Sequence, residues 1–150
     1  MQNGNTKYIW ELLNTVPDPE IPVISVVELG VIRDISFANK SYTISITPTY
    51  SGCPAVKTFM DDIKSCLKEN GIRNFKLELV YSPAWTTDWM TDATKDKLRK
   101  YGIAPPSNTV ICPQCDSEKT TLISEFGATA CKALYKCTDC LEPFEFFKCI

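Results

Sequence analysis

The stretch YTISITPTYSGCPAVKTFMDDIKSCLKENG (residues 42–71) decides the fold of the first part of the chain. Its first six residues alternate apolar and polar side chains, which is the pattern of a strand with one buried face, and Pro48 ends that strand. From Pro54 onward, apolar residues recur at helical spacing until Asn70 and Gly71, which end the helix. The predicted buried stripe of this helix is Val56, Phe59, Met60, Ile63, Cys66 and Leu67.

The segments on either side of this stretch complete an α+β domain. Asn39 and Lys40 suit a tight turn between two strands. This order of elements is typical of a two-layer protein in which helices pack on one face of a three-stranded sheet. The remaining predicted elements are a helix over residues 5–16, strands over 31–37 and 75–81, and a polar helix over 92–101.

The composition of the chain excludes several classes of protein. Of its 150 residues, 44% are apolar and 23% are charged, which is typical of a globular protein. A formal net charge of -2 argues against the broad basic surface that nucleic-acid binding requires. The chain has no membrane-length apolar run and no signal-peptide pattern at its start, so we expect a cytoplasmic protein with no membrane partner. The absence of histidine leaves thiolates and carboxylates as metal ligands.

Six of the eight cysteines fall between Cys112 and Cys149, which favours metal binding in a chain without an export signal. Cys112 and Cys115 are separated by two residues, as are Cys137 and Cys140, and two such pairs form a zinc ribbon with four thiolates in a tetrahedron. An iron centre on the same thiolates, or disulfides, are the alternatives. Four protein ligands leave no open position, so we expect the metal to fold this segment rather than to react.

The cysteine-rich tail also determines the predicted domain organisation. The residues after Thr109 are too few for an apolar core of their own, so they need a structural metal. Pro105, Pro106 and Ser107 have the composition of a linker. The sequence therefore predicts a domain over residues 1–104, a linker over 105–109 and a zinc ribbon over 110–150.

Two tail cysteines, Cys131 and Cys149, lie outside these pairs. Each alone is most simply a buried small apolar residue, and a swapped metal ligand or a redox thiol are the alternatives. The alternative is that the two together bind a second metal ion or exchange sulfur.

Cys53 is a separate candidate, because it stands between Gly52 and Pro54 where a strand gives way to a helix. Pro54 suits the first position of a helix, which would place Cys53 at the N-cap. The unpaired amides and the helix dipole at that position favour the thiolate and lower the pKa from about 8.5, which raises nucleophilicity and metal affinity. The alternative is a cysteine chosen for its small size.

Two further pairs of residues are candidates with a structural alternative. Asp18 and Glu20 offer carboxylates for a metal or for acid–base chemistry, although a turn-forming Asp-Pro loop explains them as well. Trp85 and Trp89 are four residues apart. They suit either a helix start with an aromatic contact or an exposed surface for a partner.

Five motifs occur in this order along the chain: DPEIP, ELG, TPTYSGCPA, SPAWTTDWM and CPQC...EFGATACKALYKCTDCLEPFEFFKC. Together they closely resemble the PaaD family of phenylacetate-degradation accessory proteins. The resemblance covers residues 8–150, and the first two-thirds also resemble the MIP18/DUF59 family of iron–sulfur assembly factors. Ribbons of this kind usually carry glycine directly after each cysteine pair. This chain has Asp116 and Leu141 there, so the turns must take positive φ without glycine or adopt another shape.

The resemblance implies a non-catalytic maturation factor that helps to build an iron–sulfur cluster or another metal centre in the oxygenase or reductase subunits of phenylacetyl-CoA epoxidase. It places a reactive cysteine at Cys53. Our hypothesis is that Cys53 holds a cluster or iron transiently, with a second cysteine from a homodimer mate or from the client, and with Asp18 and Glu20 beside it.

Other functions remain as alternatives. A structural subunit that stabilises the oxygenase complex is the first. An enzyme would need a base near Cys53, and without histidine the candidates are few. A nucleic-acid-binding ribbon would have only Lys132 and Lys136 as a thin basic patch.

Overall fold

The computed structural model describes residues 5–49 and 55–148, and the chain divides into two compact units, Met1–Trp85 and Thr86–Ile150. Each unit has its own sheet, of three strands in the first and four strands in the second. None of the helices in the described ranges has both the length and the apolar character to cross a bilayer.

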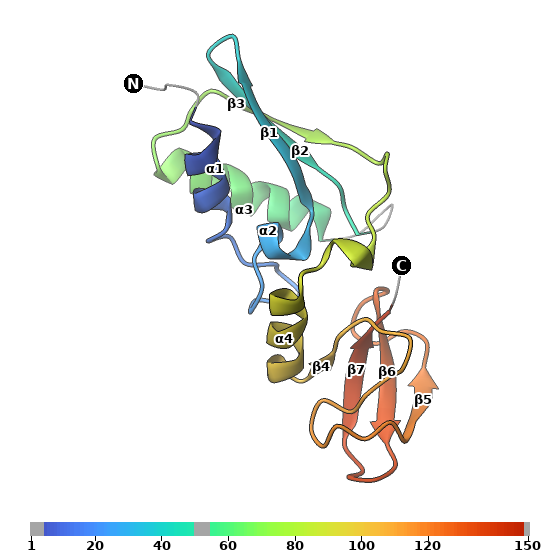
Figure 1. Cartoon of the computed structure of the whole chain (residues 1–150). Helices are drawn as coiled ribbons and strands as arrows, with labels where there is room; N and C mark the ends of the chain where they lie inside the picture. The colour runs from blue at the N-terminus through green and yellow to red at the C-terminus, as the bar shows by residue number, and fades with distance from the viewer. Residues whose placement is uncertain (1–4, 50–54, 149–150) are drawn as a thin grey trace. The chain divides into compact units, whose positions relative to one another are not determined.

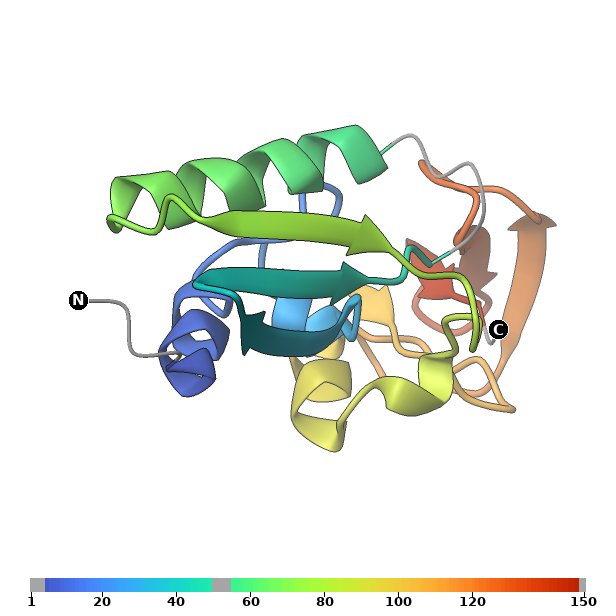
Figure 2. The same cartoon turned by 90° about the horizontal axis from the view of Figure 1, so that it is seen from above.

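The sheet of the first unit is mixed, with the strand order β1-β2-β3 (Figure 1). Its strands are β1 (Ile32–Ala38), β2 (Ser41–Ile46) and β3 (Phe75–Leu79). The strands β1 and β2 pair antiparallel, whereas β2 and β3 pair parallel. A parallel pair needs a crossover connection, and α3 (Val56–Glu69) provides it, running back along the sheet in the direction opposite to β2 and β3 (Figure 2).

The predicted tight turn between the first two strands is confirmed. Asn39 and Lys40 have φ values of 52° and 61°, and Ala38 pairs with Ser41 on either side of them. Two consecutive positive φ values are those of a type I′ turn, whose twist matches that of antiparallel strands. The strands β1 and β2 therefore form a two-residue hairpin.

One face of the first sheet is buried and the other is polar. Tyr42, Ile44 and Ile46 of β2 are at most 2% exposed. On the opposite face, Lys76 and Glu78 form an exposed ion pair. Helices α1 (Thr6–Leu13) and α3 cover the buried face through Ile9, Leu13, Phe59, Ile63 and Leu67. The predicted two-layer α+β architecture is confirmed.

Cys66 was predicted to lie in this core, and it lies at the edge of it. The side chain is half-buried. Its Sγ lies 3.6 Å from the carbonyl oxygen of Leu12 and 3.9 Å from Oγ1 of Thr15. The thiol therefore packs where α3 meets α1.

The short helix α2 (Val26–Leu29) has no counterpart among the predicted elements. Oγ of Ser25 accepts a hydrogen bond from the Glu28 amide at 3.0 Å, and Oε1 of Glu28 accepts one from the Ser25 amide at 3.1 Å. This reciprocal pair is a capping box. Gly30 ends the helix with a φ of 89°.

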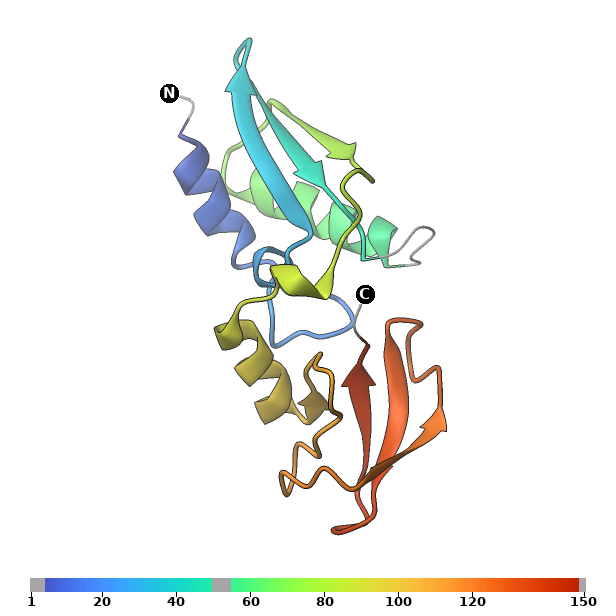
Figure 3. The same cartoon turned by 45° about the vertical axis from the view of Figure 1, so that its right-hand side comes forward.

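The second unit contains a helix and a four-stranded sheet of order β4-β7-β6-β5. The 3-10 turn η1 (Thr87–Trp89) precedes helix α4 (Asp92–Tyr101), which ends at Gly102 with a φ of 99°. Figure 3 shows the three longer strands side by side in orange and red. The strands are β4 (Ile103–Ala104), β5 (Thr120–Ser124), β6 (Lys132–Cys137) and β7 (Pro143–Phe147).

Strand β4 joins α4 to the ribbon strands. It pairs parallel with β7, through Ile103 opposite Glu145 and Ala104 opposite Phe146. The compact units consequently divide between Trp85 and Thr86, earlier in the chain than the predicted limits at residues 104 and 109. A two-residue strand carries too little pattern to be found from sequence, so its membership of the second sheet could not be anticipated.

Candidate metal centre and cysteine loop

The four cysteines predicted to form the ribbon site lie together. Cys112 and Cys115 lie before β5, Cys137 is the last residue of β6, and Cys140 lies in the turn before β7. Their Sγ atoms all lie within 4.8 Å of one another. The six cysteines within the described ranges are free thiols, so the disulfide alternative finds no support.

The spacing of the sulfurs fits a single tetrahedral ion. Zinc–sulfur bonds of about 2.3 Å in a tetrahedron place the sulfurs about 3.8 Å apart. The Sγ atoms of Cys112 and Cys140 are 3.7 Å apart, and those of Cys115 and Cys137 are 3.6 Å apart. Four thiolates would complete the coordination shell, which leaves no open position for water or substrate. The arrangement is therefore that of a metal-binding site that stabilises structure.

Backbone amides point at the two buried sulfurs. The amide nitrogen of Gln114 lies 3.4 Å from Sγ of Cys112, and that of Cys140 lies 3.4 Å from Sγ of Cys137. The hydrogen bond from the Cys140 amide lowers the pKa of Cys137 to about 7. The Glu142 amide lowers the pKa of Cys140, but desolvation and the neighbouring thiols outweigh it and raise that pKa to about 12. Cys137 is thus the more readily ionised of these two thiols.

Both turns that follow the cysteine pairs take positive φ without glycine. The φ values are 64° at Asp116 and 67° at Leu141. The carboxylate of Asp116 accepts a hydrogen bond from the guanidinium of Arg99, whereas the side chain of Leu141 is 63% exposed. Sequence reasoning missed the contact of Arg99 with Asp116, because no local pattern links residues seventeen positions apart.

Cys53 lies outside the described residues, in the segment between β2 and α3. Helix α3 begins at Val56 with Ala55 at its N-cap, and no side chain caps it. The prediction that Cys53 occupies this N-cap is therefore wrong, because the helix begins two residues later than Pro54. The proposed reactivity of Cys53 loses its helix-cap argument and stays a prediction based on the family resemblance.

Thr47, at the start of the Cys53 segment, is a polar residue that sequence reasoning did not single out. It is 2% exposed, and its Oγ1 has no hydrogen-bond partner within the described ranges. Its amide donates to the carbonyl oxygen of Val31 at 2.8 Å, which fixes the backbone at the end of β2. A buried hydroxyl without a partner costs about 1–3 kcal/mol. The sequence signal at Thr47 is weak, because it is one more polar residue after the alternating apolar and polar residues 42–46.

Asp18 stabilises the proline-rich loop. It is 6% exposed, and its Oδ1 accepts hydrogen bonds from the amides of Glu20 and Ile21, both at 2.9 Å. This geometry supports the turn-forming interpretation of Asp18. Glu20 is half-buried. The relation of either carboxylate to Cys53 lies outside the described residues, so their role beside it stays a prediction.

The two candidate tryptophans have different environments. Trp85 is 3% exposed, and its Nε1 donates to the carbonyl oxygen of Leu29 at 3.0 Å. The prediction that Trp85 forms a partner surface is therefore corrected, because its indole anchors the end of the first unit to the end of α2. Trp89 is half-buried in η1 and keeps its place as a candidate.

Among the described residues, Cys131 is not part of the cluster of four thiols. Cys131 is 5% exposed, and its Sγ lies 3.1 Å from Oγ1 of Thr129. Cys149 lies outside the described residues, so a joint role of the two stays a prediction.

Lys132 is 4% exposed and pairs with Glu145 at 3.2 Å, which removes it from the basic patch that a nucleic-acid-binding ribbon would need.

Two protein-family models match the chain. The model described as an iron–sulfur cluster assembly protein matches residues 6–71, a range that includes Cys53. The model described as the PaaD zinc beta ribbon domain matches residues 100–148, which include β4 and all four clustered cysteines. The beginning of the second match agrees with the pairing of β4 to β7.

One curated relative extends this similarity over nearly the whole chain, and two others match a part of it. A protein of Escherichia coli K12, provisionally named as one of the subunits of 1,2-phenylacetyl-CoA epoxidase, is 48% identical over 95% of this chain and 92% of its own length. The Bacillus subtilis Fe-S protein maturation auxiliary factor YitW is 30% identical over 65% of this chain and 97% of its own. A Porphyromonas gingivalis Fe-S protein maturation auxiliary factor is 33% identical over 56% of this chain and 81% of its own.

Solved structures resemble a part of the chain. The crystal structure of a domain of unknown function, DUF59, from Bacillus anthracis is 27% identical, with a TM-score of 0.57 over 61% of this chain and 89% of that one. The conserved hypothetical protein TM0487 of Thermotoga maritima is 25% identical, with a TM-score of 0.55 over 65% of this chain and 97% of that one.

Proposed function

Because this chain belongs to the PaaD family, we propose that it is an accessory maturation factor of phenylacetyl-CoA epoxidase, which assists the assembly of an iron–sulfur cluster or another metal centre in the oxygenase or reductase subunits. The main support is that one chain joins an iron–sulfur-assembly match over residues 6–71 to a complete cluster of four ribbon cysteines. The maturation factors among its relatives match 56% and 65% of this chain, and in this proposal the ribbon adapts the chain to a particular client. The chain itself catalyses no reaction in this proposal.

The ribbon holds zinc in this proposal, and its role is to fold the second unit. Four thiolates at tetrahedral spacing suit zinc, which has no redox chemistry of its own. Metal analysis and an absorption spectrum of the anaerobically purified protein test this assignment. One zinc per chain is expected, and iron in the ribbon of a Cys53→Ala protein would contradict it.

Cys53 holds the cargo, an iron–sulfur cluster or an iron ion, through its sulfur. One thiolate does not retain a cluster, so a second cysteine comes from a homodimer mate or from the client. The segment that carries Cys53 follows β2 and Thr47, which is 2% exposed. Asp18 and Glu20 remain proposed neighbours of the cargo.

The test is the cluster content of the client. Cells that carry Cys53→Ala should yield reductase with less iron and a weaker cluster absorption, and they should grow more slowly on phenylacetate. Cys66→Ala is the matched control, because it removes a half-buried thiol of α3 from the same unit. Reductase with full cluster content from the Cys53→Ala strain would show that the mechanism is wrong.

A structural role is the second candidate, because the Escherichia coli relative is named as part of the epoxidase itself. In that case the chain stabilises the oxygenase complex without handling metal cargo. Stoichiometric copurification with the oxygenase, together with normal activity of the Cys53→Ala strain, would favour it over maturation.

A further inference from the structure

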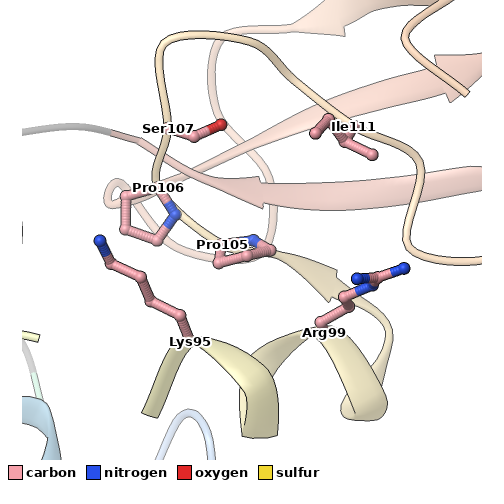
Figure 4. A pocket seen from close by; sticks show the side chains of 6 residues that line it. All are labelled: Lys95, Arg99, Pro105, Pro106, Ser107 and Ile111. Atoms are coloured by element: carbon pink, nitrogen blue, oxygen red, sulfur yellow. The ribbon is translucent and has the colours of Figure 1, made fainter. Parts of the chain in front are cut away.

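The second unit contains a cavity of about 250 Å³ between α4 and the segment that follows β4 (Figure 4). One wall is the exposed side of α4, and the other is formed by two prolines and an isoleucine. The residues that line it are Lys95, Arg99, Pro105, Pro106, Ser107 and Ile111. This cavity is separate from the sulfur cluster, and the proposed maturation chemistry does not use it.

Two positive charges lie on one side of this cavity. Lys95 and Arg99 are four residues apart on α4, so they lie one above the other on the same face of the helix. Lys95 is half-buried, and its ammonium group has no carboxylate partner within the described ranges. The guanidinium of Arg99 uses a donor on Nη2 to bind Asp116, which leaves further N–H donors for a ligand.

The opposite side of the cavity is apolar. Pro105 and Pro106 form a rigid edge, with Pro106 buried and Pro105 half-buried. Ile111 leaves 39% of its surface exposed at the other end. A ligand that fits both sides must therefore carry a negative charge next to an apolar group.

The size of the cavity selects the kind of ligand. Pockets for small molecules and cofactors usually measure about 300–1,000 Å³, and this cavity is smaller. It has room for an acidic side chain and an adjacent apolar side chain. That combination is what a short segment of a protein partner presents.

We propose that this cavity binds an acidic segment of a protein partner, with one carboxylate on Lys95 and a second on Arg99, whose side chains diverge along the cavity (Figure 4), and with an apolar side chain against Pro105, Pro106 and Ile111. Asp116 accepts a hydrogen bond from the same guanidinium and therefore competes mildly with the incoming carboxylate. The binding site therefore adjoins the turn that follows the first cysteine pair. It would serve a client under the proposed function, but it does not depend on Cys53.

A peptide selection tests the proposal and does not require the partner to be identified first. Random octapeptides displayed on phage are selected on the full-length, zinc-loaded protein. Enriched peptides should contain Asp or Glu next to an apolar residue. Fluorescence anisotropy with a labelled enriched peptide should show binding that weakens about tenfold in Lys95→Gln and in Arg99→Gln, because each loses a charge-assisted hydrogen bond.

Two matched variants separate binding from general charge and from folding. Lys100→Gln removes a positive charge from the same helix outside the cavity, and it should change the affinity less than twofold. Asp116→Asn breaks the same ion pair as Arg99→Gln, but the chain keeps the guanidinium of Arg99. The affinity for the peptide should stay equal or rise, because the competing carboxylate is gone. Parallel losses in Asp116→Asn and Arg99→Gln would show that Arg99 is only structural.

Three other outcomes would overturn the proposal. They are the enrichment of no peptide, the enrichment of peptides without acidic residues, and equal binding of sodium hexanoate with the same dependence on Lys95 and Arg99. The last result would identify a site for a free small acid. None of these outcomes bears on the maturation proposal, which is tested by the cluster content of the client.

Discussion

The two units of the chain differ in what fills their interior. The first unit buries aliphatic side chains from its sheet and helices, with Ile44, Ile46, Ile63 and Leu67 all fully buried. The core cluster of the second unit consists of Ala104, Cys112, Cys137, Phe144 and Phe146. Two of these five residues belong to the sulfur cluster. The metal site and the apolar core of the second unit are therefore one structure.

This difference shows how one chain combines two sources of stability. The first unit gains its stability from apolar area removed from water, at about 25 cal/mol per Å². The second unit has a smaller core, and Tyr135 extends it by stacking on Phe144 with 6.1 Å between ring centroids. Metal binding by the four thiolates would add to this stability, and the unit would then depend on metal supply.

Removal of the metal should have the largest effect. Binding of a structural zinc is worth roughly 10–16 kcal/mol in small zinc domains, so chelation should unfold the second unit and leave the first folded. In a two-dimensional amide NMR spectrum, signals of β5, β6 and β7 should lose dispersion while those of β1, β2 and β3 remain. Adding zinc should restore the spectrum. A dispersed ribbon spectrum without metal would show that the second unit, like the first, folds without metal.

Truncation of the aliphatic core should have the next largest effect, and only on the first unit. Ile44 is 0% exposed on the central strand, so Ile44→Ala should lower the free energy of unfolding by about 3 kcal/mol. Urea unfolding measures the loss, and zinc content should stay at one per chain. Thr43→Ala, on the opposite face of the same strand, is the matched control with a loss below about 1 kcal/mol. Equal losses in the two variants would contradict the assignment of faces.

The parts predicted correctly from sequence have local causes. Tyr42, Ile44 and Ile46 alternate because a strand with one buried face imposes that period on neighbouring residues. The pairing of Cys112 with Cys115 follows from a single turn that directs two sulfurs at one ion. Neither inference depends on distant segments, so each could be made from the sequence alone.

The parts that sequence reasoning missed depend on distant partners. Trp85 is buried because its indole binds the carbonyl of Leu29, 56 residues earlier in the chain, and no pattern around Trp85 reports that contact. The helix α2 is an exception. Ser25 and Glu28 are a recognisable capping box in the sequence, so this helix could have been found.

Within the second unit, the two turns after the cysteine pairs differ in what their side chains do. Leu141 has a φ of 67° and a side chain that is 63% exposed, so Leu141→Gly removes strain and little packing. The variant should raise the free energy of unfolding of the ribbon by about 1 kcal/mol. Urea unfolding at a fixed concentration of free zinc measures the change. A loss of stability would show that the leucine side chain contributes packing that its exposure does not reveal.

The smallest effect is expected at the equivalent position of the first turn. Asp116→Gly relieves a similar positive φ, but it also removes the ion pair with Arg99, whose side chain is 47% exposed. An exposed pair is worth about 0.2–1 kcal/mol, and aspartate tolerates positive φ better than leucine, so the two contributions should cancel to within about 0.5 kcal/mol. The same urea measurement applies. A gain as large as that of Leu141→Gly would mean that the contact of Arg99 with Asp116 adds nothing to ribbon stability.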